Sequence, residues 1–127
     1  MEEEPATVLV VDDDASIRLL CRVNLELEGY RVLEAGTLAE GRLAASDDAV
    51  RVALLDVHLG ADDGRDLLRE LRARRPDVHV ALLSGSARRE QIAREEADAL
   101  IPKPFVLEEL IETVARLAST ERRESVR

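Results

Sequence analysis

The chain has 127 residues, which at roughly 100–200 residues per domain leaves room for one domain. Hydrophobic residues make up 46% of the sequence, enough for a buried core. Acidic residues outnumber basic ones, 27 to 18, and the net charge of −9 argues against direct binding of nucleic acid or of an anionic membrane. No apolar run approaches the roughly 18 residues of a membrane span, and the acidic N-terminus is unlike a signal peptide. We therefore expect a soluble, cytoplasmic, single-domain protein.

The first predicted unit is a strand followed by a helix. The strand is Ala6–Val11, an uninterrupted apolar run of the kind that is buried on both faces of a sheet. The helix covers Ala15–Glu28 and ends at Gly29. Its predicted inner face consists of Ile17, Leu20, Val23 and Leu27.

The second and third units repeat this order. Arg31–Ala35 is a weaker run and is predicted to be an edge strand. A capping box, in which a threonine precedes Glu40 by three residues, predicts a helix over Thr37–Ser46. The third strand is predicted over Val50–Leu55, and the helix that follows it covers Arg65–Arg75.

The last two units complete the chain. A strand is predicted over Val78–Leu83, followed by a polar, exposed helix over Ser86–Glu96. A short strand over Ala99–Ile101 precedes a strongly amphipathic helix over Leu107–Leu117.

Five consecutive strand–helix units predict an α/β fold. Buried strands joined by helical crossovers form a parallel sheet that is covered on both faces, so we expect a five-stranded, doubly wound parallel sheet. A closed barrel of this type needs eight units. The domain is expected to cover residues 1–119, with a flexible C-terminal tail over residues 120–127. Ligands of open α/β sheets bind outside the carboxyl ends of the strands.

Polar side chains stand at the carboxyl ends of the four strongest predicted strands. They are Asp12 and Asp13, Asp56, Ser84 and Lys103, the last being the only lysine among the 18 basic residues. Adjacent carboxylates repel one another, and a hard divalent cation such as Mg²⁺ relieves that repulsion. A hydroxyl and an ammonium are suitable donors to phosphoryl oxygens. No base adjoins Ser84, so the better candidate nucleophile toward phosphorus is the Asp56 carboxylate.

Each of these segments has a structural interpretation when it is taken alone. Acidic residues favour helix N-termini, and we expect Asp14 to be a helix cap and not a ligand. Ser84 alone is uninformative, and Gly85 and Ser86 beside it could form an ordinary turn. Their joint occurrence at successive strand ends favours a functional site.

Four segments also resemble a known family. VLVVDDD, ALLDVHLGADDG, ALLSG and ALIPKPF are similar to the signature segments of response-regulator receiver domains of two-component signal transduction, which are chemotaxis-regulator-like. They occur in the family's order, each at the end of a predicted strand, and the resemblance covers about Thr7–Leu117. It implies a flavodoxin-like (βα)5 fold and a phosphoacceptor domain that takes a phosphoryl group from a sensor histidine kinase or phosphotransfer protein. The recipient of the signal would be a downstream protein or a fused output domain.

The resemblance also assigns roles to individual residues. Asp56 is the implied phosphoacceptor and, with Asp13, a direct Mg²⁺ ligand. Asp12 would contribute through water, and the backbone carbonyl of His58 would complete the protein ligands. The Ser84 hydroxyl and Lys103 would contact the phosphoryl group, and the peptide bond that follows Lys103 is often cis in this family. Such a domain is not a classical enzyme, although it assists its own phosphorylation and dephosphorylation.

Four features depart from the family pattern. Gly60 stands where proline is usual, Leu100 where an aromatic switch residue is usual, and the interval from Ser84 to Lys103 is shorter. The final helix carries Glu109 where receivers that dimerise ahead of DNA-binding domains have basic residues. These departures leave open a phosphorylation-independent protein-interaction module.

A rival of the enzyme class is an aspartyl-phosphate hydrolase of the haloacid-dehalogenase type, since Asp12 and Asp14 follow the first strand. The length of the chain counts against it. Whether the domain stands alone or belongs to a longer protein is also open.

Overall fold

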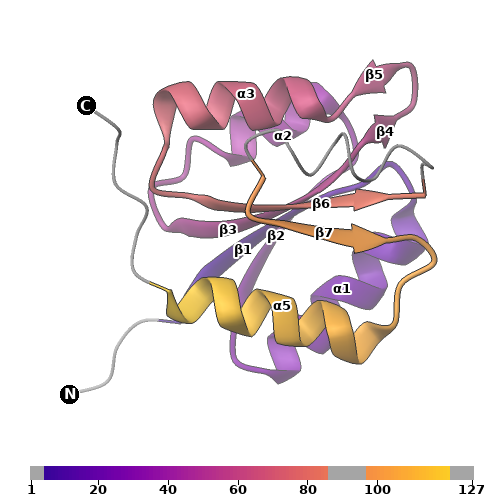
Figure 1. Cartoon of the computed structure of the whole chain (residues 1–127), viewed down its shortest axis with the longest axis vertical. Coiled ribbons are helices and arrows are strands. Elements are labelled where there is room, and N and C mark those ends of the chain that lie inside the picture. The colour runs from indigo at the N-terminus through magenta and orange to yellow at the C-terminus, as the bar shows by residue number, and fades with distance from the viewer. Residues whose placement is uncertain (1–4, 86–96, 121–127) are drawn as a thin grey trace.

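The fold is a five-stranded parallel sheet between two layers of helices (Figure 1). The computed structural model describes residues 5–85 and 97–120. Within these residues the elements are β1 (Thr7–Val11), α1 (Ala15–Leu27), β2 (Arg31–Ala35), α2 (Leu38–Ala44), β3 (Val50–Asp56), β4 (His58–Leu59), β5 (Asp62–Asp63), α3 (Arg65–Arg74), β6 (His79–Ser84), β7 (Ala99–Pro102) and α5 (Leu107–Ser119).

The strand order in the sheet is β2-β1-β3-β6-β7, and every neighbouring pair is parallel. The chain therefore moves outward from β1 to β2, then crosses back to β3 on the other side of β1. In an open α/β sheet the loops that leave strands at such a reversal diverge and leave room for a ligand. The predicted doubly wound fold is confirmed, and its reversal point lies between the ends of β1 and β3.

The two faces of the sheet bury separate apolar clusters. In β1, Leu9 and Val11 point to the cluster that includes Leu67 of α3, while Val8 and Val10 point to the cluster that includes Leu110 of α5. This alternation follows from the two-residue period of a strand. Figure 1 shows α2 and α3 covering one face of the sheet and α1 and α5 covering the other. Because both faces are covered, the central strands are apolar at almost every position.

The predicted inner face of α1 is wrong at three of its four positions. Leu20 is 42% exposed and Leu27 is 78% exposed, and Val23 is exposed as well. The side chains that α1 buries are Cys21 and Leu25, with Ile17 partly buried one turn earlier. The helix carries two apolar stripes, and only the one at four-residue spacing faces the sheet. Sequence periodicity alone could not choose between the two stripes.

Most element boundaries agree with the predicted ones to within one or two residues. The predicted N-cap of α2 is confirmed, since Thr37 Oγ1 accepts a hydrogen bond from Glu40 N at 3.0 Å. The reciprocal bond of the capping box is shifted by one residue: Glu40 Oε1 accepts from Gly36 N at 2.8 Å, and Gly36 precedes the N-cap. The hairpin of β4 and β5 lies within a segment for which no strand was predicted. The predicted helix over Ser86–Glu96 and most of the predicted C-terminal tail lie outside the described residues. In the part of the chain that the structure describes, no helix is long and apolar enough to cross a membrane.

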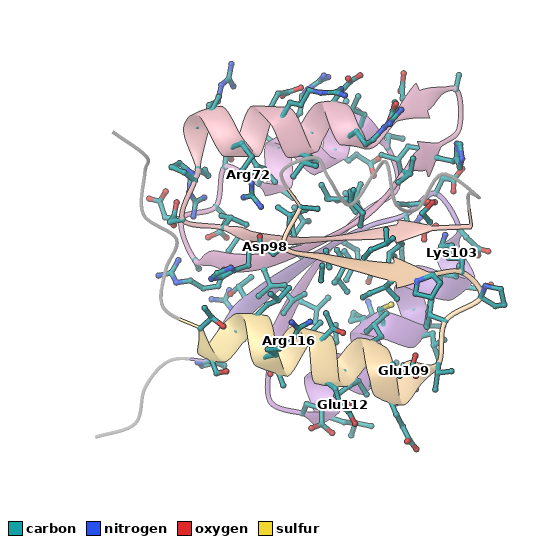
Figure 2. All side chains as sticks on the ribbon, viewed as in Figure 1. Arg72, Asp98, Lys103, Glu109, Glu112 and Arg116 are labelled. Carbon is teal, nitrogen blue, oxygen red and sulfur yellow. The ribbon has the colours of Figure 1, made fainter. Side chains whose placement is uncertain are left out.

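A largely buried ion pair ties α3 to the start of β7. Arg72 Nη2 lies 2.6 Å from Asp98 Oδ2, and their side chains are 7% and 17% exposed (Figure 2). The same Asp98 oxygen accepts a hydrogen bond from Val80 N at 2.8 Å, and Arg72 Nη1 donates to Val78 O. The pair therefore fixes the beginning of β6 and β7 together, at the end of the sheet away from the acidic residues.

Candidate metal and phosphoryl site

The structure brings the predicted polar side chains together at the carboxyl edge of the sheet. Asp12 and Asp13 directly follow β1, Asp56 is the last residue of β3, and Ser84 is the last residue of β6. Lys103 directly follows β7. Backbone pairing aligns these ends, since Val11 pairs with Leu55 and Ser84 with Pro102. The convergence that the parallel sheet predicted is therefore present.

Three carboxylates form the acidic part of the site. One oxygen from each of Asp12, Asp13 and Asp56 lies within 4.8 Å of the others. Asp12 and Asp56 are buried, whereas Asp13 is exposed. Lys103 Nζ lies 2.7 Å from Asp12 Oδ2 and 3.2 Å from Asp56 Oδ2. One ammonium therefore partly neutralises the two buried acids, and the pocket keeps an excess of negative charge.

The charges in this pocket perturb one another. Burial raises the pKa of Asp56, the nearby Asp12 charge raises it further, and Lys103 only partly offsets both. Burial opposes the charged form of Lys103, but its bonds to the two carboxylates outweigh that effect and raise its pKa. A carboxylate with a raised pKa beside a second carboxylate favours the binding of an additional cation.

Backbone groups and one arginine hold the acidic residues in place. Asp12 N donates to Ala35 O at 3.0 Å, which ties the end of β1 to the end of β2. Arg18 Nη1 donates to the Asp12 carbonyl at 2.7 Å from the second turn of α1. Asp14 is the N-cap of α1, as predicted, and accepts from Ser16 N at 2.8 Å. Arg18 was not singled out from the sequence, where no feature distinguishes it from the other arginines.

The loop after β3 contacts two of the acids. His58 N lies 3.2 Å from Asp56 Oδ1, and Gly60 N lies 2.9 Å from Asp13 Oδ2. The side chain of His58 is exposed. The residue whose carbonyl is the expected metal ligand is thus bonded through its own N–H to the expected phosphoacceptor.

Gly64 is a position where only glycine fits, because the backbone of Asp56 packs closely against it. This residue was not singled out from the sequence. A Cβ atom at this position would lie 1.9 Å from the carbonyl oxygen of Asp56. Gly64 N also donates to Val57 O at 2.8 Å, and α3 begins at the next residue. The available signal in the sequence was a glycine a few residues after Asp56 and directly before a predicted helix.

The remaining predicted residues lie around the pocket. Ser84 is 1% exposed, and its carbonyl accepts from Lys103 N at 2.9 Å. The peptide bond between Lys103 and Pro104 is cis, as the family resemblance implied. Leu100 pairs with Leu82 and packs, partly buried, against the apolar cluster on the α2 and α3 side.

The donor set fits a hard divalent cation. All three clustered side chains offer carboxylate oxygens, which Mg²⁺ prefers, and the exposed Asp13 leaves room for the water ligands that Mg²⁺ retains. Soft metals that require thiolate or several imidazoles have no such ligands in this cluster.

The chain is similar to known proteins in sequence and in fold. The family model of the response regulator receiver domain matches residues 8–115. Among curated proteins, the transcriptional regulatory protein CpxR of Klebsiella pneumoniae is 36% identical over 118 residues, which are 91% of this chain and 49% of that protein. The KDP operon transcriptional regulatory protein KdpE of Escherichia coli is 37% identical over 120 residues, 93% of this chain and 52% of that protein. The chain thus spans about half the length of these curated relatives.

Solved structures show the same architecture. A CheY-like response regulator receiver domain protein from Methanospirillum hungatei is 31% identical with a TM-score of 0.82, covering 90% of this chain and 94% of that one. The response regulator TrrA from Thermotoga maritima, solved in complex with Mg²⁺-BeF, is 28% identical with a TM-score of 0.80, covering 88% of this chain and 98% of that one. The sheet, the converging strand ends and these matches lead to one conclusion: the chain belongs to the family of response regulator receiver domains of two-component systems.

Proposed function

We propose that this domain accepts a phosphoryl group on Asp56. The observation that carries the proposal is the position of that carboxylate: it is 5% exposed, at the strand end where Lys103 and two further carboxylates converge. Burial strips water from the carboxylate, and the neighbouring groups hold it in a fixed orientation. The family match supports the same assignment.

The proposed metal ligands are Asp12, Asp13 and Asp56, with the carbonyl of His58. When bound, Mg²⁺ supplies positive charge that neutralises phosphoryl oxygens. An oxygen of Asp56 attacks phosphorus in line, so that one O–P bond forms while the bond from phosphorus to the donor's imidazole nitrogen breaks and that nitrogen takes up a proton. Lys103, already 3.2 Å from Asp56, stabilises the charge on the transferred group. The Ser84 hydroxyl is proposed to bond to the product and to report its presence.

The proposed donor is a histidine kinase or a phosphotransfer protein. The acidic cluster lies at the edge of the sheet where α1 begins, and α1 leaves apolar side chains such as Leu19 and Leu20 exposed. Val106, which lies just beyond the loop carrying Lys103, is also exposed. Exposed apolar side chains on the elements that adjoin the acidic edge of the sheet suit a protein donor better than a small phosphate ester. We further propose that residues 1–119 form the receiver and that a downstream protein or a fused output domain reads its state.

The test is phosphorylation by a small donor. Incubation with acetyl phosphate and Mg²⁺ is expected to add one phosphate to the wild-type chain, measured by intact-protein mass spectrometry. Asp56→Asn should remain unmodified. Asp48→Asn removes an exposed carboxylate outside the pocket and should be modified normally. Equal labelling of the Asp56→Asn variant would refute the assignment.

The alternative is an interaction module that signals without phosphate. Leu100, at the position where an aromatic switch is usual, already packs against the core. Amide NMR spectra with and without beryllofluoride and Mg²⁺ distinguish the two. Shifts that extend from the pocket into β7 and α5 support a phosphorylation switch, whereas shifts confined to the pocket support the module.

A further inference from the structure

We propose that Gly60 is a positioning residue for the metal site, because its backbone N–H orients the Asp13 carboxylate from the tip of the β4–β5 hairpin. Gly60 N lies 2.9 Å from Asp13 Oδ2, and the two residues are 47 positions apart in the chain. The proposal rests on the proposed function in one respect, namely that the ion held by the three carboxylates is Mg²⁺.

Asp13 differs from the other two acids in what holds it. Asp12 and Asp56 are buried, and both contact Lys103. Asp13 is exposed, and its Oδ2 accepts the N–H of Gly60. An exposed aspartate on a loop samples several rotamers. Each side chain that has to be immobilised when an ion binds lowers the affinity of the site for that ion. The hydrogen bond at Oδ2 fixes the carboxylate and leaves Oδ1 for an ion.

The backbone conformation at the hairpin tip creates this donor. His58 pairs with Asp63 and Leu59 with Asp62, so that Gly60 and Ala61 form a two-residue turn. Gly60 has a φ of +60°, and none of the described non-glycine residues has a positive φ. A positive φ at the first turn residue alone is the pattern of a type II′ hairpin, in which glycine is the favoured residue at that position. A Cβ at this position would meet nothing within 4 Å, so backbone conformation and not space explains the glycine.

The hairpin is fixed at its base as well as at its tip. His58 N donates to Asp56 Oδ1 at 3.2 Å, and Arg65 Nη2 lies 2.7 Å from Asp63 Oδ2. One short hairpin therefore bonds to two of the three carboxylates and also contains the residue whose carbonyl is the expected ligand. The conformation of the hairpin therefore determines how these carboxylates are oriented before an ion binds.

The test compares Gly60→Pro with Gly60→Asn. Proline removes the N–H and cannot adopt a positive φ, whereas asparagine keeps the N–H and is, with glycine and aspartate, a usual residue of such hairpin turns. Mg²⁺ is titrated into each labelled protein and followed by amide NMR. We expect Gly60→Pro to bind Mg²⁺ at least fivefold more weakly than wild type and Gly60→Asn to lie within about twofold.

A kinetic measurement separates positioning from general damage. With acetyl phosphate as donor, the Mg²⁺ concentration for half-maximal labelling should rise for Gly60→Pro, while the rate at saturating Mg²⁺ stays within twofold of wild type. A fall in the saturated rate with unchanged Mg²⁺ affinity would overturn the proposal. If Gly60→Pro does not fold, amide exchange of the metal-free wild type decides: the Gly60 amide should be protected relative to Ala61, and exchange at the same free rate would overturn the proposal.

The failure of this inference is distinguishable from failure of the proposed function. Unchanged Mg²⁺ affinity in Gly60→Pro, together with normal labelling of Asp56 in the wild type, would remove the role of Gly60 alone. A wild-type chain that binds Mg²⁺ through this hairpin but is never labelled would contradict the phosphoacceptor assignment alone.

Discussion

Replacing Lys103 by methionine probes the charge balance of the pocket. The substitution keeps an apolar stem of similar length and removes the ammonium that lies 2.7 Å from Asp12 Oδ2 and 3.2 Å from Asp56 Oδ2. Because the pKa of Lys103 is raised above its usual 10.5, its stabilising contribution is fully present at neutral pH. It is lost only as the pH rises through the raised pKa.

The expected loss of stability depends on how deeply the ion pairs of Lys103 are buried. Removing one partner of a fully buried ion pair costs about 3–5 kcal/mol. The Lys103 side chain is 22% exposed, and solvent screens part of the effect, so we expect a loss of about 2 kcal/mol in the free energy of unfolding without divalent ions. The variant pocket is also more negative by one charge and should bind Mg²⁺ more tightly. A tenfold gain in affinity would restore about 1.4 kcal/mol in saturating Mg²⁺.

Urea unfolding followed by circular dichroism measures the free energy of unfolding both without divalent ions and in saturating Mg²⁺. Arg69→Met is the matched control, since it removes an exposed partner of Asp66 and should change the free energy of unfolding by less than about 0.5 kcal/mol. Two results would contradict this charge balance. One is a Lys103→Met variant as stable as wild type without Mg²⁺. The other is a difference in the free energy of unfolding between the two proteins that grows in saturating Mg²⁺.

Three further predictions follow from the described contacts. Asp98→Asn leaves the buried Arg72 guanidinium without its carboxylate and should cost about 3 kcal/mol in urea unfolding; a cost under 1 kcal/mol would show that the pair is not structurally important. Gly64→Ala forces a Cβ against the Asp56 carbonyl and should cost about 2 kcal/mol, whereas Gly85→Ala, where a Cβ makes only ordinary contacts, should cost far less. Asp56→Asn should be more stable than wild type at pH 7 without divalent ions, because the raised pKa of Asp56 means that its charge opposes folding. That advantage should shrink as the pH falls through this raised pKa, above 3.8, and an advantage independent of pH would contradict the assigned cause.

The fold could be predicted from the sequence because each central strand is marked by an apolar run. Each central strand is an apolar run buried on both faces, and the polar residue that ends each run, such as Asp56 or Ser84, is the residue that reaches the site. The position of each residue along its own strand therefore sufficed to place it at the carboxyl edge. The pairing of strands in the structure added the register of the sheet, but the residues at its carboxyl edge are the ones that the sequence predicted.

The features that were missed depend on contacts between distant segments. The buried face of α1 is set by which of two apolar stripes meets the sheet, and the exposed Leu27 belongs to the stripe that does not. The bond from Gly60 to Asp13 depends on a hairpin of two-residue strands, which are too short for a periodic signal. The close approach of Gly64 to the Asp56 carbonyl depends on how the chain turns into α3.

The most direct test of the central claim is to locate the phosphoryl group in the chain. After labelling with acetyl phosphate and Mg²⁺, borohydride reduction converts an acyl phosphate of aspartate to homoserine, which peptide mass spectrometry assigns to a position. We expect homoserine at position 56 in the wild type and no conversion of Asp12 or Asp13. Conversion at another carboxylate, or a stable phosphate on Ser84, would contradict it.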